Sequence, residues 1–150
     1  MTDAAKTGAI DGYVRFFETL TPDTLDRLQD HVTPDIRFKD PFNDVTGADA
    51  MHAIFRHMFK EMESPVFQVT HRAQDAQDDS VWFLRWRLTG RLRSLSNRDW
   101  DITGMSEIHL APDGRVAAHI DHWDAGQQFY ELLPVIGSVI RLLRRRVGRN

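Results

Sequence analysis

The sequence predicts one α+β domain, and three observations support this. Apolar residues recur with helical spacing over most of the first 62 residues and then with the period of two of β-strands from residue 66 to 123. Because helices come first and long strands follow one another, the order indicates an antiparallel meander rather than βαβ units. The 150 residues, 41% of them hydrophobic, suffice for one core, and no repeat or linker divides the chain.

Three helices are expected in the first part of the chain. The first runs from about Ala9 to Leu20, and Thr21-Pro22-Asp23 is a typical start for the second. Thr33-Pro34-Asp35 should end that second helix. The third is predicted from Gly47 to about Met62, with Pro65 stopping it.

Strands account for most of the rest. A short strand, Ile36–Lys39, precedes the third helix, and four longer ones are expected over residues 66–73, 81–91, 99–110 and 115–123. Turns are predicted at residues 94–97 and at Pro112-Asp113-Gly114. Alternation along the strand 81–91 separates one face, formed by Trp82, Leu84, Trp86 and Leu88, from a second face formed by Phe83, Arg85 and Arg87.

The last part of the chain, residues 127–150, predicts a basic amphipathic helix, expected from Gln127 to about Val147. Its basic residues are Arg141, Arg144, Arg145, Arg146 and Arg149. No acid follows Glu131, so the tail carries +5, and the 14 basic and 22 acidic residues before it leave the body at −8. The favoured interpretation is a helix that packs over the sheet or the mouth of a pocket, with arginines suited to its C-terminal end. The alternative is an interfacial membrane helix, which the acidic body disfavours because an anionic surface would repel it.

Composition excludes several classes of function. Without cysteine there is no disulfide, thiolate metal site or cysteine nucleophile. The acidic body argues against a nucleic-acid-binding protein. Gly8 to Gly12 does not follow a strand, so it is not a nucleotide-binding loop. The chain starts without a signal-peptide pattern and has no apolar run of about 20 residues, so a soluble, cytoplasmic protein is expected.

Three segments make the chain resemble a known superfamily. They are Phe38-Lys39-Asp40-Pro41, Gly47 at the start of a helix, and Pro112-Asp113-Gly114-Arg115-Val116 leading into a strand that ends at Trp123. From about Ile10 to Trp123 the chain resembles the nuclear-transport-factor-2-like superfamily, which includes the SnoaL-like and ketosteroid-isomerase-like proteins. The resemblance implies a cone, in which a curved mixed or antiparallel sheet wraps around the N-terminal helices and a pocket opens at the wide end. It also implies a homodimer.

The resemblance also implies roles for particular residues. Asp40 corresponds to the general base of ketosteroid isomerases, and Tyr13 to a donor of their oxyanion hole. Their second donor, a protonated Asp, corresponds to Ser106, and this departure argues against steroid isomerisation. SnoaL-like polyketide cyclases use an Asp with a His nearby, which suits His119 and Asp121 better.

The residues themselves support the same candidates, each with a structural alternative. A carboxylate at Asp40 in an apolar pocket would lose hydration and become a better proton acceptor; alternatively, it caps a turn. Strand alternation places His119 and Asp121 on one face, where the carboxylate could fix the tautomer of the imidazole; alternatively, they are a structural pair. A metal site would need Asp40 as third ligand, and no metal or other cofactor is expected.

The predicted pocket wall is mostly apolar. Its candidate substrate-binding residues are Trp82, Trp86, Trp123, Ile54, Phe55, Met58 and Ser106, although aromatic residues at strand spacing often form plain core. Two hypotheses follow. The first is an isomerase, cyclase or dehydratase without a cofactor, using acid–base chemistry on a small apolar or cyclic substrate. The second is a non-catalytic carrier of a lipid-like ligand, associated with a membrane surface through its tail.

Overall fold

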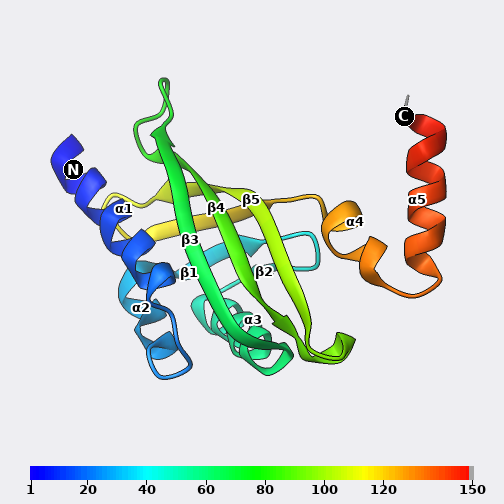
Figure 1. Cartoon of the computed structure of the whole chain (residues 1–150). Helices are drawn as coiled ribbons and strands as arrows, with labels where there is room; N and C mark the ends of the chain where they lie inside the picture. The colour runs from blue at the N-terminus through cyan, green and yellow to red at the C-terminus, as the bar shows by residue number, and fades with distance from the viewer. Residues whose placement is uncertain (149–150) are drawn as a thin grey trace.

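The computed structural model describes residues 1–148, and it has the expected α+β architecture (Figure 1). A six-stranded sheet has the order β2-β1-β6-β5-β4-β3. Its strands are β1 (Val32–Lys39), β2 (Asp44–Thr46), β3 (Met62–Gln74), β4 (Val81–Leu92), β5 (Arg98–Leu110) and β6 (Val116–His122). Neighbouring strands are antiparallel except β1 and β6, which run parallel. The predicted meander is therefore confirmed for β3 to β6.

Helices pack against the sheet and enclose the core with it. They are α1 (Asp3–Glu18), α2 (Leu28–His31), which follows a 3-10 turn at Leu25–Arg27, and α3 (Ala48–Glu61). Thr2 caps α1 by accepting a hydrogen bond from the Ala5 amide. Helix α1 lies against β3, and α3 contacts β1 and β3. The fully buried side chains between these layers include Ile10, Tyr13, Leu28, Ile36, Phe38, Met51 and Ile108.

The structure corrects the bounds of the first two predicted helices and the role given to Pro65. Helix α1 begins at Asp3, six residues before the expected Ala9. The second helix is one short turn, because β1 already begins at Val32, which pairs with Val116 of β6. Helix α3 ends at Glu61, and β3 begins at Met62, before Pro65. Pro65 instead lies where the pairing between β3 and β4 is interrupted, a position that tolerates a residue without an N–H group.

The predicted continuous C-terminal helix is also corrected. It is divided into α4 (Ala125–Gln128), a 3-10 turn at Tyr130–Leu132 and α5 (Ile136–Val147). Before α5, Pro134 cannot donate a helical hydrogen bond, and Val135 has a left-handed φ of 65°. Arg149 and Asn150 lie outside the described residues.

Helix α5 does not pack over the sheet, so that expectation was wrong. It projects away from the sheet (Figure 1) and contacts mainly the 3-10 turn before it. Gly137 is its only buried residue. Phe129 and Leu132, by contrast, pack against a core cluster that includes Trp100. Among residues 1–148, no helix is long and apolar enough to cross a membrane.

This arrangement predicts that two truncations differ in stability. Removing residues 134–150 should lower Tm by no more than about 4 °C, because α5 has only one buried residue and the ion pair that is lost, between the exposed Arg144 and the largely buried Glu131, stabilises the fold by about 1 kcal/mol. Removing residues 129–150 also deletes Phe129 and Leu132, and should cost about 2–4 kcal/mol. Calorimetry on both variants measures the difference. A large loss of stability in the variant that lacks only residues 134–150 would show that α5 belongs to the folded body.

Candidate functional site

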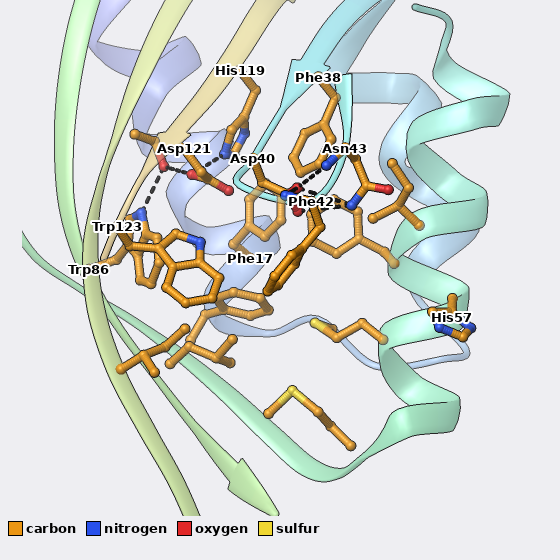
Figure 2. Close-up of a pocket in the computed structure, with 18 of the residues that line it drawn as sticks. Phe17, Phe38, Asp40, Phe42, Asn43, His57, Trp86, His119, Asp121 and Trp123 are labelled. Carbon is orange, nitrogen blue, oxygen red and sulfur yellow. Dashed lines mark hydrogen bonds and ion pairs between the residues drawn. The ribbon is translucent and has the colours of Figure 1, made fainter. Parts of the chain in front are cut away.

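A cavity of about 370 Å³ lies between the sheet and the helices (Figure 2). Aromatic and aliphatic side chains form most of its wall, including Phe17, Phe38, Phe55, Met58, Trp86 and Trp123. Its acidic lining residues are Asp40, Glu61 and Asp121, and among residues 1–148 no lysine or arginine lines it. The cavity therefore combines an apolar wall with negative charge.

A continuous series of hydrogen bonds crosses the sheet wall of the cavity. Tyr13 Oη of α1 lies 2.7 Å from His119 Nδ1, and His119 Nε2 lies 2.9 Å from Asp121 Oδ1 on the same strand, β6. Ser106 Oγ of β5 donates to this same carboxylate oxygen over 2.5 Å. Trp86 Nε1 of β4 then donates to Ser106 Oγ over 2.8 Å. We call these five residues the polar chain.

The polar chain fixes where its protons lie. The carboxylate of Asp121 can only accept, so Nε2 of a neutral His119 carries the proton and donates it. Nδ1 of His119 is then the acceptor, and the hydroxyl of Tyr13 donates to it. Because Ser106 and His119 both donate to Oδ1, the second oxygen of Asp121 has no hydrogen-bond donor among the described residues. Figure 2 shows this carboxylate among the side chains that line the cavity, which also include Asp40.

Burial keeps the Tyr13 hydroxyl protonated. The side chain is only 1% exposed, and this desolvation raises the pKa of Tyr13 well above its usual value. The negative charge of Asp121 adds a smaller contribution in the same direction. Tyr13 is therefore a fixed hydrogen-bond donor that orients His119.

Asp40 lines the cavity and also caps a turn. Its Oδ1 accepts hydrogen bonds from the backbone amides of Phe42 and Asn43, over 2.8 and 2.6 Å, and from the Asn43 side chain. Asn43 Nδ2 also approaches Oδ2, at 3.2 Å. The contacts of Asp40 are thus those of a residue that caps a turn, which was the structural alternative to a catalytic role. Because Asp40 also lines the cavity, a chemical role can still be tested. The two carboxylates differ, because only that of Asp121 presents an oxygen without a protein donor.

The structure brings together most of the predicted site residues. Besides the polar chain and Asp40, the cavity wall contains Trp123, Ile54, Phe55 and Met58. Their roles in binding and catalysis stay predictions. Trp82 is a correction: it lies on the same face of β4 as Trp86 but belongs to the buried core, 6% exposed, and does not line the cavity.

Sequence reasoning missed two features of the site. Asn43 holds Asp40, and its place three residues after an Asp could have indicated a side-chain-capped turn. Gly104 of β5 lies opposite Trp86 of β4, where a methyl group would overlap the indole ring. A glycine within a strand is a general sign of such a close approach. Among residues 1–148, no group of three His, Cys, Asp or Glu side chains is placed to hold a metal ion.

Replacing Gly104 should disturb the site through Trp86. In Gly104→Ala the new methyl group must displace the ring, and with it the hydrogen bond from Trp86 to Ser106. Overpacking of this kind costs about 1–3 kcal/mol. We expect a lower Tm and a changed fluorescence of Trp86, with Gly8→Ala, in open space on α1, as the control. A Gly104→Ala protein that matches the wild type in both would contradict the close contact.

The buried state of Tyr13 predicts how stability changes at alkaline pH. The folded state holds Tyr13 neutral, whereas the unfolded chain releases its proton near pH 10. The stabilisation is thus complete below about pH 10 and is lost as pH rises further. In a Tyr130→Phe background, where Tyr13 is the one remaining tyrosine, tyrosinate absorbance should appear only together with unfolding. Absorbance that appears while the protein stays folded would contradict the burial.

Comparison with known proteins gives a family for most of the chain. The SnoaL-like domain family matches residues 13–119, a range that includes Tyr13, Asp40 and His119. No curated protein matches the sequence significantly.

Solved structures show the same fold at low sequence identity. A putative SnoaL-like polyketide cyclase from Jannaschia sp. CCS1 has a TM-score of 0.68 at 16% identity, covering 81% of this chain and 86% of its own. A putative polyketide cyclase from Xanthomonas campestris pv. campestris has a TM-score of 0.69 at 12% identity, covering 88% and 100%. An LEH-like epoxide hydrolase from M. tuberculosis has a TM-score of 0.65 at 11% identity, covering 93% and 92%. At these identities the likeness concerns the fold alone.

Proposed function

Because this chain belongs to the SnoaL-like domain family, we propose that it is an enzyme that moves protons on a small, largely apolar substrate without a cofactor. One observation carries the proposal: the polar chain presents a carboxylate oxygen of Asp121 to a largely apolar cavity. Structures described as putative polyketide cyclases and as an epoxide hydrolase share this fold, which is consistent with small-molecule chemistry.

In the proposed reaction, Asp121 is the base. Its second oxygen takes a proton from a carbon next to a carbonyl group, and the electron pair left behind is delocalised onto the carbonyl oxygen. Asp121 then returns the proton to the same or another carbon, so the step needs no co-reactant. His119 and Ser106 hold the carboxylate in place throughout. This assignment shifts the role of base from Asp40, the sequence-based candidate, because the oxygens of Asp40 already accept hydrogen bonds within its turn.

The charge of the cavity selects among substrates. With Asp40, Glu61 and Asp121 in the wall and no lysine or arginine lining it among residues 1–148, an anionic ligand would be repelled. Neutral ketones and related cyclic compounds suit the aromatic wall. We therefore propose an uncharged apolar or cyclic substrate.

A carrier of a lipid-like ligand is the second candidate function. The exposed Phe42, at 46%, and the apolar wall favour it. Against it, an apolar ligand makes no use of the three carboxylates in the wall, and their desolvation is unfavourable.

Exchange of carbon-bound hydrogen in D2O tests the proposal without knowledge of the natural substrate. With 2-tetralone as the probe ketone, NMR should show exchange faster than in buffer alone. Asp121→Asn should lower this rate by about 10²–10⁴-fold, the range typical of a lost general base. Asp99→Asn, which removes an exposed carboxylate of β5, is the matched control and should leave the rate unchanged.

The same exchange assay distinguishes Asp121 from Asp40 as the base, and an enzyme from a carrier. Asp40→Asn should keep most of the exchange activity if Asp121 is the base. Full activity in Asp121→Asn together with loss in Asp40→Asn would return the role to Asp40. Binding of 2-tetralone, detected by tryptophan fluorescence, without any exchange would favour the carrier.

A further inference from the structure

Helix α5 carries an apolar stripe that the rest of the protein does not cover. Ile136, Val139 and Leu143 are about half exposed, at 50, 51 and 53%, and Val147 is 91% exposed. Their spacing of three or four residues places them on one face of the helix, together with Ile140. A monomeric protein seldom leaves such a contiguous face in water, so the stripe indicates an interaction surface.

Arginines border this apolar stripe. At 100° per residue, Arg144 and Arg146 lie at its two edges, while Arg141 and Arg145 lie on the opposite side of the helix. No acidic residue follows Glu131 in the sequence. Arg141 donates to the backbone oxygen of Glu131, and Arg144 lies 3.2 Å from its carboxylate, which ties the start of α5 to the preceding turn.

We propose that α5 is an interfacial helix that binds the surface of an anionic lipid bilayer. Its aliphatic stripe would lie among the acyl chains near the headgroups, and the bordering guanidinium groups would contact lipid phosphates. Complementary charge is the observation that commits the surface to this partner. Each arginine near an anionic membrane strengthens binding about fivefold.

The position of α5 removes the objection raised by the acidic body. The sequence before the tail carries a net −8 and would itself be repelled by anionic lipid. However, α5 projects from the body (Figure 1), and its apolar stripe is exposed. Repulsion between exposed charges is screened over about 8 Å at physiological ionic strength, so only acidic residues of the body that come within that distance of the membrane oppose binding.

Part of the cavity wall lies near the start of this helix. Phe42 and Phe129 both line the cavity and contact each other, and Phe129 also contacts the exposed Tyr130. Only Leu133, Pro134 and Val135 then separate the 3-10 turn from α5. Binding through α5 would therefore hold this part of the cavity wall close to the membrane surface.

Vesicle co-sedimentation of the full chain tests the proposal and does not depend on catalysis. The probes are vesicles of 30% phosphatidylglycerol in phosphatidylcholine and vesicles of pure phosphatidylcholine, each in 50 and 500 mM NaCl. We expect at least tenfold tighter binding to the anionic vesicles at low salt, and loss of most of this preference at high salt. Arg144→Gln/Arg146→Gln, which removes the two guanidinium groups at the edges of the stripe, should weaken the binding roughly 25-fold. Arg93→Gln/Arg98→Gln removes the same charge from exposed positions on the body and should have little effect.

A second variant tests the apolar stripe. Val139→Glu/Leu143→Glu should abolish vesicle binding while circular dichroism and Tm of the body stay unchanged. Three results would overturn the proposal: equal binding to both vesicle types, an equal loss in the body control, or no vesicle binding at all. If the chain instead self-associates in sedimentation velocity and Val139→Glu/Leu143→Glu abolishes this, the partner of α5 is a second copy.

Discussion

The convergence of two donors on one oxygen of Asp121 is the constraint on which the site depends. His119 and Ser106 reach Oδ1 from β6 and β5, so the carboxylate cannot rotate without breaking both hydrogen bonds. A hydrogen bond to a charged group contributes about 1.5–3 kcal/mol, and rotation would also leave buried donors unpaired. The second oxygen is therefore held toward the cavity before any ligand arrives, which is the preorganisation that acid–base catalysis requires.

The fold keeps that arrangement rigid from behind. Tyr13 is fully packed in the core and cannot turn away from His119, while Trp86 lies over Gly104 and holds Ser106. The four residues that position Asp121 come from four different elements: Tyr13 from α1, Trp86 from β4, Ser106 from β5 and His119 from β6. Packing of the helix against the sheet thus sets the geometry of the carboxylate, and the aromatic core has a chemical as well as a structural role.

The sequence predicted the features that follow from periodicity. Alternation placed His119 and Asp121 on one face of β6 and identified the apolar face of β4, because each side chain's face depends only on its place in the strand. The family resemblance then indicated which face of β6 meets the cavity. Periodicity does not show which positions along a strand lie next to the cavity. For this reason Trp82 and Trp86 looked equivalent, although only Trp86 lines the cavity. Nor does an amphipathic pattern show what covers a helix. The apolar stripe of α5 predicted a helix correctly, but its break from the body depends on Pro134 and the left-handed Val135.

In the proposed reaction, the second oxygen of Asp121 receives a proton from a ligand in the cavity. A crystal structure of the chain soaked with 2-naphthol, whose hydroxyl mimics an enol, tests this most directly. We predict that the naphthol hydroxyl donates to Asp121 Oδ2 over about 2.5–3.0 Å, with the rings against the aromatic wall. A naphthol hydroxyl bound to Asp40 instead, or a ligand in the cavity with no contact to Asp121, would contradict the account.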